Sequence, residues 1–286
     1  MNTIKISLLT IFGIGLVFFY GCDETMSGFD YKKDVVVNGI LTAGQNVDTL
    51  KLHWTGEVDK FYDRKAMAIS GAVVLIQNAD GTTFDSLVYV DSGVGYYHSI
   101  DPLKIIEPTK TYRLYVETPD PDKRVVTSTI TVPDTFSLFY ATVNNNDTLK
   151  YDVNAPPHFF YWTPSNFAAT YLPTVSSLDP GAALIPKSFY PDTTSKDFQY
   201  PKKKDFRVGL PVEQTYTILP WVFLNYFGHT RFEIYAVDKN YSDFLNQFVT
   251  AQGGELKEIR FNIQGGIGIF GAKTLAKNSI DVYLVP

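Results

Sequence analysis

Cysteine is almost absent from the chain, and histidine is scarce. Cys22 is the one cysteine in 286 residues, so no disulfide can form within the chain and no group of thiolates can hold a metal ion. The 4 histidines stand singly and lack the H-x-H and H-E-x-x-H spacings that bring two imidazoles to one zinc ion. The sequence therefore predicts neither a disulfide framework nor a metal site.

Positive charge is in deficit. Lysine and arginine number 25 against 30 aspartate and glutamate residues, which gives a formal net charge of −5. The one basic run, Lys202 to Lys204, is short and lies between aromatic and acidic residues, as is typical of a solvated loop. Because sequence-independent binding of nucleic acid needs clustered cations, we expect no nucleic-acid partner.

Catalytic motifs are missing as well. Gly266 to Gly271 spells G-x-G-x-x-G, but a dinucleotide site needs a following helix and an acidic residue about 20 positions further on. Only 286 − 271 = 15 residues remain, and Ile280 to Val285 among them is strand-like. We expect these glycines to permit a tight loop or a close approach of backbones. No G-x-S-x-G elbow is present, so we expect no enzyme and no cofactor; a carboxylate pair for glycoside hydrolysis has no fixed spacing and stays open.

The N-terminus has the parts of a secretory signal. Lys5 precedes an apolar run from Ile6 to Tyr20, which at about 15 residues is shorter than the roughly 20 that a transmembrane helix needs. The segment from Phe18 to Cys22 resembles a bacterial lipobox, although Phe19 and Tyr20 are bulkier than the usual residues. We therefore predict that residues 1–21 are a signal peptide and that Cys22 carries the lipid. Each buried methylene contributes about 0.8 kcal/mol, so several acyl chains hold a protein on a bilayer.

Residues 22–33 are polar and are predicted to form a tether. Asp23 and Glu24 directly follow the cysteine and resemble the surface-export signal of Bacteroidota lipoproteins. The alternative is an acidic tether that carries no address. We expect a lipid-anchored protein of the outer membrane that faces the cell exterior.

The rest of the chain is rich in strand-forming residues, with 21 Phe and 19 Tyr. Residues 34–133 are predicted to form an immunoglobulin-like β-sandwich, because seven short segments with turn signals between them show no helical period. Leu50 to Trp54 alternates apolar and polar residues, and the turn Asn78 to Gly81 joins two strands as a hairpin. The other expected strands are Val35–Leu41, Ala72–Gln77, Phe84–Val90, Gly95–Ile100, Tyr112–Glu117 and Val125–Thr131.

Residues 134–286 are predicted to form a second β-rich domain with one short helix. Pro133 and Asp134 mark the boundary, and the helix is expected from Tyr241 to Ala251, before Gly253 and Gly254. The fold class is thus mostly β. The expected strands are Ser137–Val143 and Leu149–Val153 as a hairpin, the buried strand His158–Thr163, Phe232–Val237, Leu256–Ile263 and Ile280–Val285.

The stretch from Pro164 to Pro211 is rich in Pro and aromatic residues and has little periodicity. Long irregular segments in compact domains are often functional, so we predict that this insertion makes the main partner contact. The alternative is an insertion that packs its own rings. The predicted contact residues are Tyr171, Phe189, Tyr190, Phe198 and Tyr200.

Several of these segments resemble a known family. V-V-V-N-G-I at 35–40, G-A-V-V-L-I-Q-N-A-D-G at 71–81, N-Y-S-D-F-L at 240–245 and F-N-I-Q-G-G-I-G-I-F-G-A at 261–272 are similar to the domain-of-unknown-function 4249 family of Bacteroidota lipoproteins. The resemblance implies a cell-envelope lipoprotein, often encoded near TonB-dependent outer-membrane receptors. Its motifs are structural, and no catalytic residue is carried over.

Three roles follow from these expectations. The first is a non-enzymatic binding or accessory subunit of a TonB-dependent outer-membrane transporter, attached to the membrane by its lipid and in contact with the β-barrel. The second is a structural subunit of an envelope assembly or secretion complex. The third is a glycan-binding module or hydrolase, because sandwiches host many functions. The third role needs exposed rings, for which the candidates are Tyr161, Trp162, Tyr190, Tyr200 and Trp221.

Lipidation of Cys22 is directly testable. The substitution Cys22→Ala removes the only thiol that can accept an acyl chain. We expect the variant precursor to remain unprocessed at this site and to lose metabolic labelling with fatty acid. A variant that still incorporates labelled fatty acid would show that another residue is the acceptor.

Overall fold

The computed structural model describes most of the chain from Tyr31 onward. The predicted leader, Cys22 and the larger part of the predicted insertion lie outside the described residues. Among the residues that the structure describes, no helix is both long and apolar enough to cross a bilayer. The described ranges are 31–57, 60–91, 94–179, 183–185, 207–209, 212–219, 221, 224–252 and 261–286, without the side chains of 207–209 and 248–252.

The first sandwich has an immunoglobulin-like strand order. One sheet has the order β1-β2-β6-β5, and the other has the order β4-β3-β7-β8. Lettered by chain order these are A-B-E-D and C′-C-F-G, so the predicted immunoglobulin-like sandwich is confirmed. The strands are β1 (Val35–Thr42), β2 (Leu50–Trp54), β3 (Val73–Asn78), β4 (Thr83–Ser86), β5 (Val88–Val90), β6 (Tyr96–His98), β7 (Thr111–Glu117) and β8 (Val125–Thr131).

Alternation of apolar and polar residues explains these strands. In β1 and β7 every second side chain is buried. The expected single strand Phe84–Val90 is wrong, because the chain divides there into β4 and β5, which lie in different sheets. Leu87 between them is buried, and its N–H donates to the Val74 carbonyl at 2.9 Å. The chain thus passes from one sheet to the other at a residue that packs in the core.

The second sandwich also has an immunoglobulin-like order. One sheet contains β14-β11-β9, and the other contains β10-β17-β15 with β12 and β13 beyond β15. The order β17-β15-β12-β13 corresponds to G-F-C-C′ of variable-type domains. The strands are β9 (Leu138–Ala141), β10 (Asp147–Lys150), β11 (His158–Trp162), β12 (Thr170–Ser177), β13 (Arg207–Gly209), β14 (Tyr216–Leu219), β15 (Gly228–Val237) and β17 (Ile280–Val285).

Two sequence expectations for this half need correction, and a third lies mostly outside the described residues. The expected hairpin around Asn144–Asp147 is wrong, because β9 pairs with β11 whereas β10 pairs in parallel with β17. The stretch Pro164–Pro211 is not wholly irregular, since β12 lies in it and pairs with β15 from Thr170 to Ser177. Most of β12 is buried on both faces, so it lacks the alternation that reveals a half-buried strand. Leu256–Ile263 lies mostly outside the described residues, and residues 261–263 are not strand.

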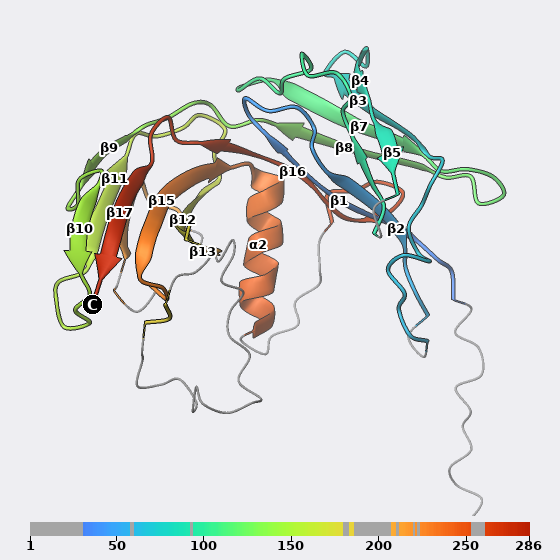
Figure 1. Cartoon of the computed structure of the whole chain (residues 1–286). Coiled ribbons are helices and arrows are strands. Elements are labelled where there is room, and N and C mark those ends of the chain that lie inside the picture. The colour runs from blue at the N-terminus through green and yellow to red at the C-terminus, as the bar shows by residue number, and fades with distance from the viewer. Residues whose placement is uncertain are drawn as a thin grey trace, which may run out of the picture.

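The connection between β15 and β17 carries the helix α2 (Lys239–Gln252) and the strand β16 (Ile267–Leu275). The one short helix predicted for this half is therefore present. β16 begins away from the second sandwich and pairs in parallel with β1, from Val36 opposite Ile267 to Thr42 opposite Lys273. Its other end pairs with β15. One strand thus belongs to the sheets of both sandwiches, and Figure 1 shows it joining the two arms of an arch, with α2 beneath it.

The buried apolar residues form two clusters. One contains residues of 35–132 together with Ile263, Phe270 and Ala272, and the other contains residues of 136–284. The predicted boundary at Pro133 and Asp134 lies between the clusters, apart from those three C-terminal residues, which pack in the first one. The first core is therefore completed by a segment that lies far away in the sequence.

Two glycines allow β16 to lie against β1. A Cβ atom on Gly268 would come 2.0 Å from the Val37 carbonyl oxygen, and one on Gly266 would come 2.6 Å from the Val35 carbonyl oxygen. Gly268 also has φ of +109°, which other residues rarely adopt. The expected close approach of backbones is confirmed.

We predict that Gly268→Ala lowers the free energy of unfolding by about 3 kcal/mol, because the new methyl group clashes with the β1 backbone and the φ value strains it. Gly44→Ala is the matched control: Gly44 has φ of +79° but open space around its Cβ position. It should cost only about 1 kcal/mol. Urea unfolding of both variants measures the difference, and equal costs would contradict the proposed role of the close approach.

Candidate functional site

The outer face of the sheet β14-β11-β9 carries six large apolar side chains. In β11 the buried residues alternate with Phe159 and Tyr161, which are half-buried and lie on the opposite face. Tyr216 and Ile218 of β14 are exposed on that face as well. The expectation that His158–Thr163 is a wholly buried strand is therefore wrong for one of its faces. We call this surface the aromatic face; it consists of Phe139, Tyr140, Phe159, Tyr161, Tyr216 and Ile218.

An irregularity in β9 adds a ring to the aromatic face. Tyr140 is opposite Tyr161, but Leu138 is opposite Trp162, so Phe139 is an extra residue on the β9 side. Phe139 is 66% exposed and Tyr140 is 53% exposed. A bulge of this kind re-aims a side chain that regular pairing would turn into the core. Two consecutive residues of one strand therefore expose their rings.

Tyr161 is the centre of a row of rings that crosses the three strands. Its ring centroid lies 5.7 Å from that of Tyr216, with 24° between the ring planes, and 5.6 Å from that of Tyr140. Phe139 adds a fourth ring, 6.4 Å from Tyr161. Rings on facing positions of neighbouring strands support one another. The surface is thus held in place before any partner binds.

The aromatic face contains no charge. The strands L-F-Y-A, H-F-F-Y-W and Y-T-I-L have no Asp, Glu, Lys or Arg. Their one titratable base, His158, is buried on the core side, and burial lowers its pKa. The face therefore offers rings for apolar packing and phenol hydroxyls for hydrogen bonds. It holds neither a general base nor a metal ligand at its surface.

Of the predicted contact residues, the structure describes only Tyr171. Tyr171 is only 5% exposed, and its ring packs against Phe136 and Trp162 with centroids 5.6 and 5.3 Å away. Its hydroxyl accepts a hydrogen bond from the Ser165 N–H at 2.9 Å, so the whole side chain belongs to the core. The other four predicted contacts, Phe189, Tyr190, Phe198 and Tyr200, lie outside the described residues.

The rings predicted for glycan binding divide in the same way. Trp162 and Trp221 are buried, whereas Tyr161 lies on the aromatic face. Tyr190 and Tyr200 lie outside the described residues. Sequence reasoning missed the other five residues of the aromatic face, which are Phe139, Tyr140, Phe159, Tyr216 and Ile218. Both faces of β11, H-F-F-Y-W, carry aromatic residues. The sequence of this strand therefore does not show by itself which of its rings are exposed.

A cluster of charged side chains joins β15 to β17. Arg231 donates two hydrogen bonds to Asp281, at 2.7 and 2.8 Å, and the His229 ring nitrogen Nε2 lies 3.1 Å from the same carboxylate. The hydrogen bond from Arg231 lowers the pKa of Asp281. The Tyr283 ring stacks on His229 at 5.0 Å. All these groups are engaged with one another across the two strands, which is the geometry of a structural tie. Within the described ranges, no group of three acidic, histidine or cysteine side chains could hold a metal ion.

A polar cavity of about 470 Å³ lies where the first sandwich, the start of α2 and residues 262–264 meet. Asn262 holds this junction: its Nδ2 donates to Ser128 Oγ at 2.7 Å, and its Oδ1 accepts the Phe270 N–H at 3.2 Å. Apart from Arg113 the lining side chains are neutral. They are Ala79, Thr111, Thr127, Ser128, Thr129, Asn240, Asn262 and Gln264.

Asp238 ties the helix to β16 beside this cavity. Its Oδ1 accepts the N–H groups of Tyr241 and Ala272, both at 3.0 Å, so it caps α2 and binds β16 at once. Burial raises the pKa of this carboxyl to about 6, against the hydrogen bonds that favour its charged form.

Comparison with known proteins gives a family but no activity. A family model described as a domain of unknown function (DUF4249) matches residues 24–279. No curated protein matches the chain.

Similar solved structures are distant. A two-domain fibronectin type-III segment of chicken tenascin is 14% identical, with 72% of this chain and 92% of that chain covered and a TM-score of 0.21. A mutant of Salmonella alpha-2-macroglobulin is 11% identical, with 88% of this chain and 15% of that chain covered and a TM-score of 0.25. The BSP domain of a biofilm associated protein is 12% identical, with 85% of this chain and 29% of that chain covered and a TM-score of 0.23. The chain thus spans less than a third of the last two, and its fold assignment rests on strand order.

Asp238 generates a prediction about pH. Its folded pKa of about 6 lies above the ordinary pKa of an aspartate, 3.8. The folded state therefore keeps a proton that the unfolded state has released, and this group's contribution to stability falls as pH rises from about 4 to about 6. Asp238→Asn removes the titration. Relative to wild type, the variant's free energy of unfolding should rise by roughly 3 kcal/mol across that window, measured by urea unfolding at several pH values. A difference that does not change with pH would contradict the assignment.

Proposed function

The chain belongs to the DUF4249 family, and we propose that it is a lipid-anchored protein of the outer membrane, displayed at the cell surface, that acts without enzymatic chemistry as a binding or accessory subunit of a TonB-dependent transporter. The lipobox-like segment ending at Cys22 and the acidic pair behind it support the anchor and its direction. The family resemblance supports the kind of partner.

The aromatic face is the observation that carries the binding role. Six large apolar side chains gathered on one exposed sheet face favour aggregation unless a partner covers them. The centres of protein interfaces are rich in Tyr and Phe and poor in charged residues, and the aromatic face has this composition. Its rings are already fixed by their neighbours, so binding loses little side-chain freedom.

The tether supports a partner in the same membrane. The eight residues 23–30 between the lipidated cysteine and Tyr31 limit the distance from Cys22 to Tyr31 to at most about 30 Å. The first sandwich therefore stays near the bilayer surface. Figure 1 shows β1, the first strand after the tether, in one arm of the arch, whereas β9 and β11 lie in the other arm. The aromatic face is thus free to meet the rim of a neighbouring barrel.

Glycan binding is the second candidate, because one observation favours it. A row of uncharged tyrosines with free edges also suits sugar rings, which pack on aromatic faces and bond to hydroxyl groups. A structural subunit of an envelope assembly or secretion complex would have the same exposed surface but would bind another protein of that complex. The partner recovered from the membrane separates the three roles.

We predict that Tyr161→Ser lowers the amount of barrel protein recovered in a mild-detergent pull-down from native membranes by about tenfold or more, since a ring at an interface centre contributes about 2 kcal/mol. Tyr283→Ser is the matched control, because Tyr283 also stacks on a facing ring but lies in the other sheet. It should recover the partner at the wild-type level. A cooperative melt of both variants shows that each is folded.

The other outcomes decide against the proposal. Equal recovery of the barrel by both variants would remove the aromatic face from the contact. Recovery of envelope proteins other than a transporter barrel would favour a structural subunit. Retention of a neutral polysaccharide that is lost with Tyr161→Ser, without any barrel, would favour the glycan-binding module.

A further inference from the structure

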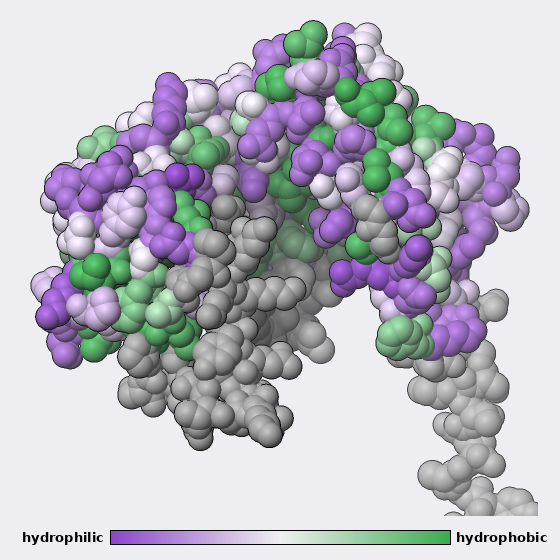
Figure 2. All heavy atoms as spheres, viewed as in Figure 1, coloured by the Kyte–Doolittle hydropathy of each residue, from purple (hydrophilic) through white to green (hydrophobic). Residues whose placement is uncertain are grey.

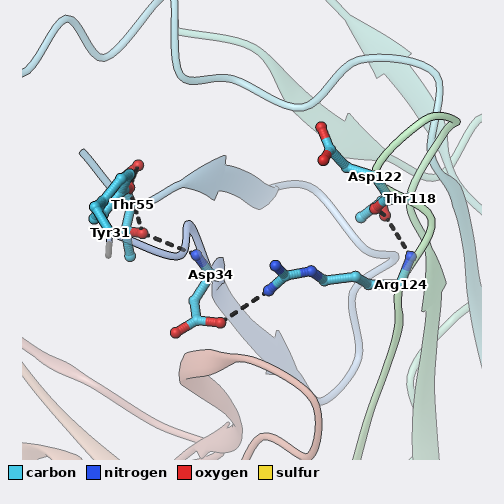
Figure 3. A network of polar contacts seen from close by, with 6 residues as sticks. All are labelled: Tyr31, Asp34, Thr55, Thr118, Asp122 and Arg124. Carbon is cyan, nitrogen blue, oxygen red and sulfur yellow. Dashed lines mark hydrogen bonds and ion pairs between the residues drawn. The ribbon is translucent and has the colours of Figure 1, made fainter. Parts of the chain in front are cut away.

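The first described residues are fastened to one end of the first sandwich. The Arg124 guanidinium donates to the Asp34 carboxylate at 2.9 Å, and the Arg124 N–H donates to Thr118 Oγ1, also at 2.9 Å (Figure 3). Lys33 forms an ion pair with Asp122 in the same β7–β8 connection. The direction in which the N-terminal chain leaves the fold is therefore fixed by side-chain contacts.

The same end holds the start of the connection between β2 and β3. The Tyr31 hydroxyl bonds to both oxygens of Thr55, and the Asp34 N–H donates to Thr55 Oγ1 at 2.9 Å (Figure 3). Thr55 directly follows β2. A backbone bond from the Trp54 N–H to the Met67 carbonyl, 2.8 Å long, closes the connection. Residues 60–65 are thus held beside the point where the tether enters.

Residues 60–65, K-F-Y-D-R-K, form a basic and aromatic loop. The Phe61 side chain is 93% exposed, and Tyr62 is exposed as well. Arg64 and Lys65 are exposed and belong to no ion pair in the described ranges, whereas Lys60 pairs with Glu57. The Asp63 carboxylate accepts the N–H groups of Lys65 and Ala66, at 2.9 and 3.3 Å, and so shapes the turn.

The other charges at this end are mostly paired. Lys33 and Asp122 form one ion pair, and Arg124 and Asp34 form another. In the described part of this end, the cations that belong to no ion pair include Lys32 of the tether in addition to Arg64 and Lys65. Figure 2 shows hydrophobic and hydrophilic residues side by side on this end of the molecule.

This composition matches the chemistry of a bilayer surface. Aromatic rings with a polar edge collect at the boundary between headgroups and acyl chains, and lysine and arginine are attracted to anionic headgroups. Moving the exposed ring of Phe61 out of water into the apolar part of a bilayer is favourable in free energy. One acyl anchor together with a basic patch is a known way to strengthen attachment.

We propose that residues 60–65 make a second contact with the membrane, with Phe61 in the interfacial layer and Arg64 and Lys65 against anionic headgroups. This inference rests on the proposed lipid anchor at Cys22. A flexible chain of nine residues, the length of 22–30, spans roughly 16 Å, so a loop linked to the anchor by such a chain stays at high effective concentration near the bilayer. Two points of contact fix the tilt of the first sandwich, which a single tether leaves free.

The opposite end of the same sandwich provides a matched control. Leu103 lies in the β6–β7 connection and is 85% exposed. That connection bonds to the β1–β2 connection, through Ser99 N–H to Val47 at 2.7 Å and Gly44 N–H to Ile106 at 2.8 Å. Thr55 lies at the other end of β2, so Leu103 and Phe61 occupy opposite ends.

The experiment uses the full lipidated protein in vesicles of phosphatidylcholine and phosphatidylglycerol that contain brominated phosphatidylcholine, which quenches tryptophan. In the Phe61→Trp variant, we expect quenching beyond that of wild type, and in the Leu103→Trp variant no additional quenching. Adding Arg64→Gln and Lys65→Gln to the Phe61→Trp variant should remove most of the extra quenching.

Two results would overturn the inference in distinguishable ways. Protein that sediments with the vesicles while Phe61→Trp is quenched no more than Leu103→Trp keeps its lipid anchor but has no loop contact. Protein that fails to sediment with vesicles has no anchor, and the proposed function falls together with the loop contact.

Discussion

The parallel pairing of β1 with β16 is the constraint on which the other features depend. β1 is the strand that the tether enters, and β16 belongs to the connection between two strands of the second sandwich. Seven paired positions therefore join the end of the molecule nearest the proposed anchor to the arm that carries the aromatic face. Phe270 of β16 is fully buried in the first core, so the contact involves packing as well as backbone hydrogen bonds.

A shared strand differs physically from a linker. Domains joined by a peptide alone move freely unless their interface is large and apolar. Here one sheet continues through β15, β16 and β1, and the side chains of Asp238 and Asn262 accept the N–H groups of Ala272 and Phe270 in β16. The distance from tether to aromatic face is thus set by the fold. This account explains why contact with a membrane at one end and contact with a partner at the other would be coupled.

Local pattern revealed much of this fold and little of the site. Alternation placed β2 at Leu50–Trp54 and β8 at Val125–Thr131, with the bounds that the structure has. Alternation did not reveal β12, because both faces of that strand are buried and apolar and polar residues do not alternate along it. It also did not reveal the exposed face of β11, because both faces of that strand are aromatic. The glycines of β16 indicated a close approach but not its partner, since β1 lies more than 200 residues earlier in the sequence. These features depend on burial and on pairing between segments that are distant in the sequence. Neither can be predicted from a short stretch of residues.

The aromatic face is most directly tested by photo-crosslinking in intact cells. A benzophenone amino acid placed at Tyr161 should form a covalent product with an outer-membrane barrel protein on illumination. The same amino acid at Leu103, which is also exposed but lies in the other sandwich, should not. A barrel product from Leu103 and none from Tyr161 would contradict the account and assign the contact to the first sandwich.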